Sequence, residues 1–434
     1  MKPLVLVAGA LANKPHNGGA AWTRLSWVLG LRQMGFEVRF IETIDALPGQ
    51  GGIEDRRDAL SFSRGDLAAD AAAVKGTPRE RGGSLSKQEG RSRNGLEGSG
   101  DRRAAVSRGP ADFFRQTLAQ FGVPGILLDG DAARHSRWEE AREWASQCQF
   151  LLNITGHLRE PRLLELVRRK AYLDLDPGYT QIWHHQGHDL GLQNHDLHFT
   201  IGENIGKDFC PIPACDFCWI PTRQPSLLDQ WPALAAANPH LFTTVASWRN
   251  PYGGLEFQGR KYGQKAHEFR RFIDLPRQLA GLGGGSASQT EFELALDIHT
   301  GDEEDRRALE ERGWRISQAR RLNTPDAFRR YVRDSGAEFS VAQGVYVHTQ
   351  SGWFSDRTVR YLSSGRPALV QDTGLGHNIP LGDGLLTFRT LEEAADGVRR
   401  IADDYDRHSR AARRLAESHF DSRSILEAFL QRIG

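Results

Sequence analysis

The chain has 434 residues, 39% of them hydrophobic, which is enough to bury a sizeable core and favours two domains over one. Its formal net charge of +1 gives no overall basic field that would attract nucleic acid, so we expect no nucleic-acid partner. Four cysteines in so long a chain do not form a disulfide framework, and the apolar run after Met1 is too short for a signal peptide or transmembrane segment, so we expect a cytoplasmic protein.

The first forty residues predict a β-loop-α-β unit. Residues 3–10, PLVLVAGA, form a short apolar run closed by glycine, which is typical of a strand buried on both faces of a parallel sheet. Residues 20–34 place apolar side chains on one stripe of a helix. The pair Gly35-Phe36 ends this helix before a second strand at 37–42.

The composition changes between about residues 49 and 110. This stretch is crowded with Gly, Ser, Arg and Glu and has few large apolar residues, so it cannot bury enough surface to offset its ordering entropy. We predict a disordered insertion here. A helix is expected at 111–123, followed by strands at 149–157 and 195–206 that complete the first half of the chain.

Residues 218–240 are rich in proline and tryptophan and indicate an interdomain connection. The alternation of strand and helix then restarts and predicts a second α/β half. The expected strands of this half lie at 241–248, 293–299, 337–344 and 367–374. The fold class is therefore α/β, with two doubly wound Rossmann-like domains and a ligand cleft at the carboxyl ends of their strands.

The predicted boundaries follow from this pattern. Residues 1–225 form the N-terminal domain, 226–240 the linker and 241–415 the C-terminal domain. A C-terminal helix at 416–434 could pack back on the first domain.

Residues 351–374, SGWFSDRTVRYLSSGRPALVQDTG, hold the most informative motif. A Ser/Gly loop opens a helix at Asp356, the helix ends at Gly365, and Arg366-Pro367 leads into a strand. The backbone N–H groups of 351–356 and the helix N-terminus could bind an anion. The alternative is an ordinary helix start, since any α/β protein contains such turns.

This motif resembles the donor-binding domain of GT-B nucleotide-sugar glycosyltransferases, especially their group 1 class. Residues 16–38, HNGGAAWTRLSWVLGLRQMGFEV, are similar to the Gly-Gly loop, helix and strand start of that class. Together the two motifs extend the resemblance over most of the chain outside 49–110. It implies two domains facing across a cleft and transfer of a sugar from a nucleotide-sugar donor to an unidentified acceptor, with no cofactor beyond the donor itself.

The resemblance also implies residue roles on the donor side. Gly18 and Gly19 would let the backbone approach the donor diphosphate, and Arg249 and Lys265 would neutralise it, because charge-assisted bonds stabilise a departing diphosphate. The alternative is that both are solvated charges at helix ends. The other donor-binding residues expected from the resemblance are Ser247, Ile316, Ser351, Gly352, Trp353, Phe354, Ser355 and Asp356.

One position departs from the pattern of the group. Where these enzymes usually have a glutamate that grips the ribose, five residues before the helix-ending glycine, this chain has Arg360. Asp356 lies one turn earlier and could supply a carboxylate instead. The base is expected against a loop at residues 314–317.

A metal site is the main alternative on the acceptor side. The candidate ligands are His184, His185, His188, His195, His198, Cys210, Cys215 and Cys218. No fourth cysteine follows Cys218, and a predicted strand separates the histidines from the cysteines. Since free cysteine often behaves as a small buried apolar residue, we expect a packed loop and no metal.

Three residues on predicted cleft loops are candidate catalytic bases: His16, His157 and Asp176. Transfer with inversion needs a group that takes the proton of the acceptor hydroxyl, and His or Asp suits that role. Ordinary surface or structural roles are at least as consistent with each residue. The alternatives for the whole chain are a nucleotide-sugar epimerase of the same fold or a Cys/His metal-binding protein. For a transferase, we expect closure of the two domains to exclude water.

Overall fold

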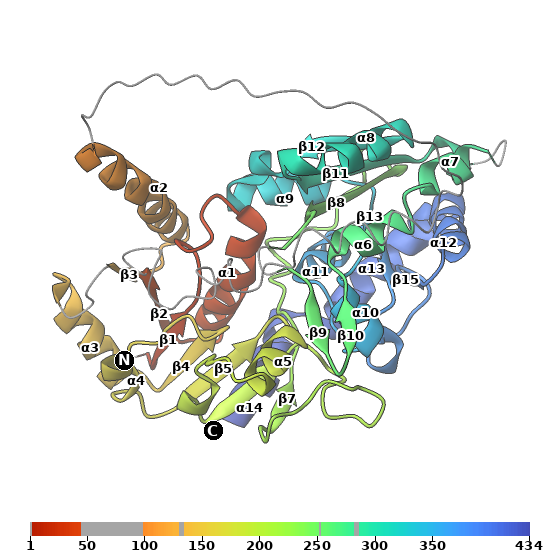
Figure 1. Cartoon of the computed structure of the whole chain (residues 1–434). Helices are drawn as coiled ribbons and strands as arrows, with labels where there is room; N and C mark the ends of the chain where they lie inside the picture. Colours follow the sequence, from red (N-terminus) through yellow and green to blue (C-terminus); the bar gives the residue numbers. More distant parts are fainter. Residues whose placement is uncertain (1, 45–98, 130–133, 251–252, 282–285) are drawn as a thin grey trace, which may run out of the picture.

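The structure is a computed structural model that describes residues 2–44, 99–129, 134–250, 253–281 and 286–434. Two α/β domains lie side by side (Figure 1). Most of the insertion predicted at about 49–110 lies outside the described residues. The helix expected from residue 111 begins earlier, since α2 spans Ser99–Gln120.

The first domain is built on a seven-stranded parallel sheet with the order β3-β2-β1-β4-β5-β6-β7. The central strand β1 (Leu4–Ala8) is buried along its whole length, as its continuous apolar run predicts. The other strands are β2 (Glu37–Ile44), β3 (Gly125–Asp129), β4 (Phe150–Ile154), β5 (Lys170–Asp174), β6 (Leu197–Thr200) and β7 (Trp219–Pro221). Its helices are α1 (Gly18–Gln33), α2, α3 (Trp138–Gln147), α4 (Pro161–Leu164) and α5 (Tyr179–His185).

The second domain repeats this plan with a six-stranded parallel sheet, ordered β12-β11-β8-β13-β14-β15. Its strands are β8 (Leu241–Ser247), β11 (Glu291–Asp297), β12 (Trp314–Gln318), β13 (Ala337–Ser340), β14 (Ala368–Gln371) and β15 (Leu385–Phe388). Its helices are α6 (Lys265–Arg270), α7 (Leu275–Ala280), α8 (Glu303–Glu311), α9 (Pro325–Asp334), α10 (Gly344–Thr349), α11 (Asp356–Ser363), α12 (Leu391–Asp403) and α13 (Tyr405–His419). An antiparallel hairpin, β9 (Leu255–Phe257) and β10 (Arg260–Tyr262), stands apart from the sheet.

In each sheet the order of the strands reverses at the first strand in sequence. Strand β1 pairs with β2 on one side and with β4 on the other, and β8 pairs in the same way with β11 and β13. Ligands of doubly wound sheets bind at this point, beyond the carboxyl ends of the strands. The predicted fold class, two doubly wound domains, is confirmed.

The two domains share one hydrophobic cluster. Trp22 of α1 packs edge-on against Trp231 of the linker, with 5.1 Å between ring centroids, and Trp231 packs against Phe328 of α9 at 6.3 Å. The indole nitrogen of Trp22 donates to the carbonyl oxygen of Pro325 at 2.8 Å. Figure 1 shows α1 beside α9. Helix α1 therefore belongs to the interior of the whole molecule and is buried on nearly all sides, not only on the predicted stripe.

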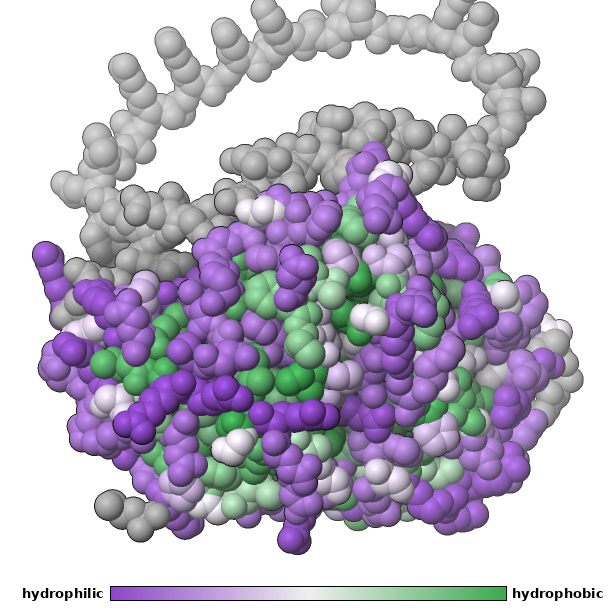
Figure 2. All heavy atoms as spheres, turned by 90° about the horizontal axis from the view of Figure 1, so that it is seen from below, coloured by the Kyte–Doolittle hydropathy of each residue, from purple (hydrophilic) through white to green (hydrophobic). Residues whose placement is uncertain are grey.

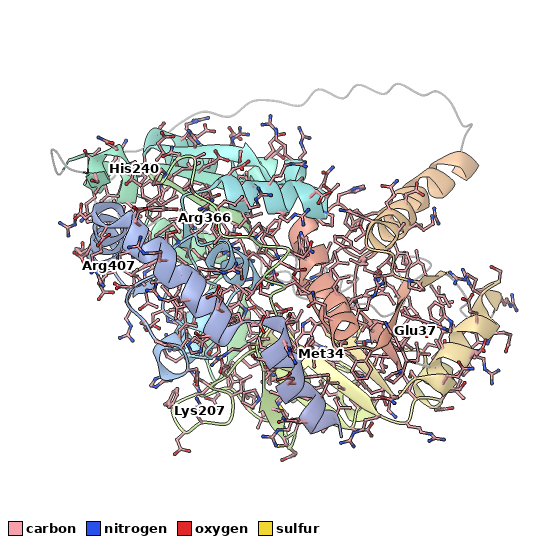
Figure 3. All side chains as sticks on the ribbon, turned by 180° about the vertical axis from the view of Figure 1, so that it is seen from behind. Met34, Glu37, Lys207, His240, Arg366 and Arg407 are labelled. Carbon is pink, nitrogen blue, oxygen red and sulfur yellow. The ribbon has the colours of Figure 1, made fainter. Side chains whose placement is uncertain are left out.

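The C-terminal segment crosses back to the first domain. A single helix was predicted at 416–434, but these residues form the end of α13 followed by α14 (Ser422–Ile433). Helix α13 ends at His419, and Asp421 caps the start of α14. Phe429 of α14 packs against Trp27, Phe150 and Phe199. Figure 3 shows α14 beside α1, near Met34.

The outer surface is mixed in character. The face in Figure 2 is largely hydrophilic, with separate apolar patches between the polar side chains. Among the described residues, no helix has both the length and the apolar character needed to cross a membrane.

Candidate functional site

A cavity of about 480 Å³ lies between the domains, at the carboxyl ends of both sheets. This is the place that the doubly wound fold predicts for a ligand. The first domain and linker line it with Lys14, Pro15, His16, Asn17, Gly19, Ala20, Thr23, Arg24, Thr155, Leu175, Asp176, Ile201 and Gln224. The second domain lines it with Val245, Ala246, Ser247, Asp297, Ala319, Arg320, Leu322, Phe328, Trp353, Asp356 and Arg357.

A buried carboxylate shapes the loop after β1. Glu42 accepts hydrogen bonds from the backbone N–H groups of Leu11, Ala12 and Asn13, each at 2.8 Å. Burial raises the pKa of Glu42, while these N–H bonds act in the opposite direction by stabilising the charged form. Glu42 thereby fixes the chain that carries residues 14–17 to the rim of the cavity.

Two of the three candidate bases reach this cavity. His16 is exposed in the loop after β1, and its ring packs against Phe113 with 5.6 Å between centroids. Asp176 is exposed after β5, and its Oδ1 accepts the hydroxyl of Tyr346 from the second domain at 3.2 Å. The buried carboxylate of Asp174 accepts the backbone N–H of Asp176 at 3.0 Å and so positions this turn.

The third candidate base, His157, stands apart from the residues that line the cavity and is partly exposed after β4. Burial of its ring and the nearby charges of Arg24, Lys14 and Arg159 lower the pKa of His157 well below its ordinary value. The imidazole is therefore neutral at neutral pH and only weakly basic. Its prediction as a base is the least supported of the three.

The start of α11 forms the second-domain wall. Asp356 lines the cavity and accepts a hydrogen bond from the hydroxyl of Thr23, across the domain boundary. Trp353 also lines the cavity, and its ring stacks on Tyr346 with 4.4 Å between centroids. Within the described residues, no protein acceptor takes the backbone N–H groups of Phe354, Ser355 or Asp356. These three N–H groups keep the predicted capacity to bind an anion.

The rest of the 351–356 loop serves packing. The N–H of Gly352 donates to the Thr373 carbonyl at 2.8 Å, and that of Trp353 donates to Oγ of the buried Ser351 at 3.2 Å. Phe354 is buried and stacks on Phe420. The N–H groups of Gly352 and Trp353 are therefore already bonded within the protein, and the donor-binding role of residues 351–356 stays a prediction.

A cluster of charges lies behind this wall. Lys265 is at the first position of α6, as predicted, and burial, reinforced by the charge of Arg357, lowers the pKa of Lys265 to about 7. Arg357 donates to Glu338, to Oγ of Ser340 at 2.6 Å and to the Val245 carbonyl at 2.7 Å. No role was predicted for Arg357 from the sequence, although its position directly after Asp356 in the helix-opening motif was the signal that could have found it.

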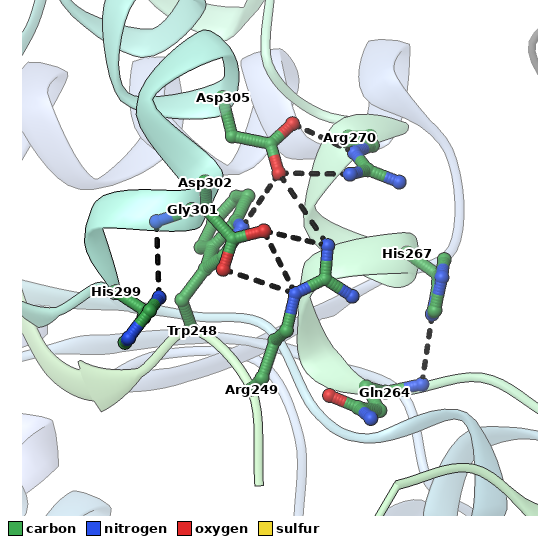
Figure 4. A network of polar contacts seen from close by, with 9 residues as sticks. All are labelled: Trp248, Arg249, Gln264, His267, Arg270, His299, Gly301, Asp302 and Asp305. Atoms are coloured by element: carbon green, nitrogen blue, oxygen red, sulfur yellow. Dashed lines mark hydrogen bonds and ion pairs between the residues drawn. The ribbon is translucent and has the colours of Figure 1, made fainter. Parts of the chain in front are cut away.

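Arg249 has a different role from the predicted one. Its Nη2 lies 2.8 Å from Oδ1 of Asp302, and its Nε donates to both oxygens of the same carboxylate at 2.9 and 3.0 Å. Asp305 lies beside this pair, where it also accepts from Arg270 (Figure 4). Arg249 is therefore ion-paired with the turn before α8 and is not among the residues that line the cavity, so its pairing with a ligand phosphate stays a prediction.

Of the four other predicted donor-binding residues in this region, two line the cavity and two do not. A Cβ on Gly18 would lie 2.1 Å from the carbonyl oxygen of Thr324, so Gly18 allows close contact with the second domain, and it is not among the residues that line the cavity. Gly19 and Ser247 line the cavity as expected. Ile316 lies within strand β12, not in the predicted loop, and packs on the second core, so the chain at 319–322 lines the cavity in its place.

Two arginines are buried at the domain boundary. Arg360 donates to the Pro225 carbonyl and to Oγ of Ser26, each at 2.8 Å, and so joins α11 to the linker and to α1. Arg24, which the sequence analysis left without a role, is 4% exposed and lines the cavity. The sequence does contain a signal for Arg24. Trp22 and Trp27 lie on different faces of α1, which indicates a helix buried on several sides, so a charged residue between them is expected to be buried as well.

The histidine and cysteine region makes protein contacts. His195 binds the Gly191 carbonyl through Nδ1 at 2.8 Å, and burial lowers its pKa to about 4. His198 binds the Leu192 carbonyl at 2.8 Å, and the thiol of Cys215 donates to the Gln181 carbonyl at 3.2 Å. In the described parts of the chain, no group of three or more His, Cys, Asp or Glu residues is arranged to hold a metal ion.

No family model matches the sequence, and no curated protein is detectably similar to it. Solved structures of HepE from Anabaena do share its fold. The complex with UDP and glucose has a TM-score of 0.52 at 10% identity and covers 99% of both chains, and the complex with UDP-glucose gives the same values. The complex with UDP alone has a TM-score of 0.51 at 9% identity, over 100% of this chain and 99% of HepE. The likeness extends across both domains and shows that this chain has the two-domain GT-B fold.

Proposed function

We propose that this protein is a glycosyltransferase that moves a sugar from a nucleotide-diphosphate donor to an acceptor, with the donor on the second domain. The observation that carries the proposal is the cavity between the two sheets, which has the start of helix α11 on one side and exposed candidate bases on the other. The UDP and UDP-glucose complexes of HepE, on the same fold, support a uridine nucleotide as the donor. A cytoplasmic location and the lack of a further cofactor are parts of the proposal that rest on the sequence.

The donor side has the groups that a diphosphate needs. The N–H groups of 354–356 point from the start of α11, where the helix dipole favours an anion. Lys265 supplies positive charge behind this turn, and Arg357, which is ion-paired with Glu338, lies beside it. A diphosphate near Lys265 raises the pKa of its amine, and the resulting ammonium stabilises the charge that develops as the sugar leaves.

On the acceptor side, Asp176 is the best-placed base. Its carboxylate is exposed at the cavity, the Tyr346 hydroxyl orients it, and the backbone N–H bond to Asp174 holds its turn. A carboxylate in this position can take the proton of an acceptor hydroxyl. His16 lies on the same side of the cavity and is the second candidate.

The proposal is tested by thermal unfolding with nucleoside diphosphates and UDP-glucose, followed by assays of UDP-glucose without acceptor. Binding to the native state raises the unfolding midpoint. We expect a shift with UDP that is lost in Lys265→Met and kept in Lys261→Met, a matched change on the exposed hairpin strand β10. Slow release of free glucose from UDP-glucose supports a transferase, whereas conversion of UDP-glucose to an epimer overturns it. A wild-type protein that no nucleotide stabilises also overturns the proposal.

A further inference from the structure

Arg24 is a buried cation that the protein satisfies only in part. Its side chain is 4% exposed, and its Nη1 donates to the Ala20 carbonyl at 3.1 Å, within the same helix. Within the described residues, its Nε is buried without a hydrogen-bond partner. Burial lowers the pKa of Arg24, but an arginine remains charged at neutral pH. A buried charge with open donors favours a partner that comes from outside the protein.

The nearby carboxylates have other partners. Asp356, Glu42 and Asp176 are close enough to act on the charge of Arg24. Glu42 accepts three backbone N–H groups, Asp356 accepts the hydroxyl of Thr23, and Asp176 accepts that of Tyr346. In the described parts of the chain, no hydrogen bond joins Arg24 to any of these carboxylates.

The cavity in front of Arg24 belongs to the acceptor half of the site. Thr155, Leu175 and Ile201 line it after three neighbouring strands and give it a partly apolar wall. Two cations, Lys14 and Arg24, line this half of the cavity together with the carboxylate of Asp176. In such surroundings a guanidinium forms its strongest contacts with planar or tetrahedral oxyanions, through paired N–H bonds.

We propose that Arg24 binds an oxyanion group of the acceptor, a carboxylate or a phosphate on the molecule whose hydroxyl receives the sugar. This inference rests on the proposed function and narrows its substrate class to acidic acceptors. Asp176 lies on the same side of the cavity, where its carboxylate can face the acceptor hydroxyl. Because Asp176 repels an anion on this side of the cavity, a bound acidic group must contact the guanidinium itself, which fixes the orientation of the acceptor.

The donor diphosphate is the other possible source of an oxyanion. It already has partners on the second-domain wall, at the start of α11 and at Lys265 and Arg357. The two sources are separated by measuring the binding of UDP and of sugar acids independently. Four probes serve for the acceptor side: glucuronate, its neutral methyl ester, glucose 6-phosphate and glucose.

The experiment is calorimetric titration of each probe into the full-length protein, with and without saturating UDP. Wild type is compared with Arg24→Met, Arg24→Lys and Arg32→Met, which removes an exposed charge from the same helix. We expect the wild type to bind glucuronate or glucose 6-phosphate but neither neutral sugar. Arg24→Met is expected to weaken that binding by about tenfold or more, the scale of one charge-assisted pair, with UDP affinity unchanged. Circular dichroism checks that the variants are folded.

Arg24→Lys keeps the charge but loses the paired geometry, so it should also weaken acid binding, and it serves as the test if Arg24→Met does not fold. Equal binding of the acid and neutral sugars, or loss of UDP binding alone in the Arg24 variants, overturns the inference. A wild type that binds glucuronate but not UDP retains the Arg24 site and removes the proposed function, so the two failures are distinguishable.

Discussion

At the scale of single residues, Lys265 connects the charge of the cavity wall to pH. Its pKa in the folded protein is about 7, below the ordinary 10.5, because burial and the charge of Arg357 disfavour the ammonium, while Glu338 and Asp356 oppose this. Above pH 7 the amine is therefore increasingly neutral in the free protein. A bound diphosphate favours the charged form and draws in a proton.

We predict that the affinity for UDP-glucose is greatest below pH 7 and falls above it, by at most about tenfold per pH unit because one proton is coupled to binding. UDP-glucose is the suitable ligand because it lacks the terminal phosphate that titrates in UDP. Lys265→Met should lower the affinity for UDP-glucose and flatten its dependence on pH. Calorimetric titrations between about pH 6 and about pH 9 measure both, because this range begins roughly one unit below the pKa of Lys265 and ends roughly two units above it. A slope that is unchanged in the variant would contradict this role.

The same shift affects stability with a defined sign. The unfolded chain keeps the Lys265 proton up to the ordinary pKa of 10.5, whereas the folded protein releases it near 7. Between these values the unfolded state binds more protons, so this residue makes the free energy of unfolding rise with pH. Lys265→Met should remove that increment, and urea unfolding at neutral and alkaline pH compares the two proteins.

Asp176 is the candidate base whose removal should slow sugar transfer. Asp176→Asn should lower the rate of sugar transfer by roughly 100- to 10,000-fold, the contribution of a general base, because an amide cannot accept the acceptor proton. The affinity for UDP-glucose should stay unchanged, since the residue lies on the opposite wall from α11. Steady-state kinetics with a matched control, the exposed Asp208→Asn, checks the outcome. If His16→Gln lost a comparable part of the transfer rate while Asp176→Asn kept the wild-type rate, the base would be His16 and not Asp176.

The candidate residues show where sequence reasoning reaches its limit. Local patterns selected His16, Asp176, Ser247 and Asp356 from loops after strands and from the start of a helix, and all four line the cavity. They could not exclude Arg249, because its partner Asp302 is 53 residues away in the chain. Nor could they find Arg24, whose position at the cavity follows from the packing of α1 between two domains.

At the scale of elements, the contact between α1 and the segment before α9 depends on Gly18. Asn17 caps α1 by accepting the N–H of Ala20 at 2.9 Å, and Gly18 then lies directly against the Thr324 carbonyl. A Cβ there would be 2.1 Å from that oxygen, which is backbone and cannot rotate away. Alanine is otherwise the better helix residue, so any loss of stability reflects this contact alone.

We predict that Gly18→Ala lowers the free energy of unfolding by about 1–3 kcal/mol, the usual cost of overpacking. Gly281→Ala is the matched control, because a Cβ at Gly281 meets its nearest atoms at an ordinary 3.6 Å. Urea unfolding measures both. A Gly18→Ala protein as stable as the wild type would show that α1 and α9 can separate without cost.

The central strands of the two sheets were predictable, and elements at the edges or outside the sheets were not. The buried apolar runs of β1 and β4 and the strand pattern of β8 identified the two doubly wound sheets. The edge strand β12 was taken for a loop, since Trp314–Gln318 alternates weakly, and the short helix α5 was not predicted, since Tyr179–His185 is rich in polar residues. Their structure comes from pairing with β11 and from packing, which no local pattern contains.

At the scale of the molecule, the structure bears on the predicted closure of the domains. Several polar contacts already cross the boundary, among them Trp22 to the Pro325 carbonyl, Thr23 to Asp356, and Arg360 to Ser26. Arg360 also lies over the ring of Trp231, with its Cζ 5.8 Å from the ring centroid, in the cluster shared by both domains. The residue that replaces the usual ribose-binding glutamate therefore joins the domains.

A boundary of this kind predicts a molecule that binds its donor with little change in shape. Burial lowers the pKa of Arg360 to about 10, so its charge persists at neutral pH, held by two hydrogen bonds and the indole ring. We predict that the small-angle scattering profile of the wild type is the same with and without UDP. Arg360→Met keeps the bulk of the side chain but removes its hydrogen bonds, so it should lower the unfolding midpoint and give an expanded profile that contracts when UDP is added. A wild-type profile that contracts with UDP would instead establish domain closure and show that the shared cluster separates in the free protein.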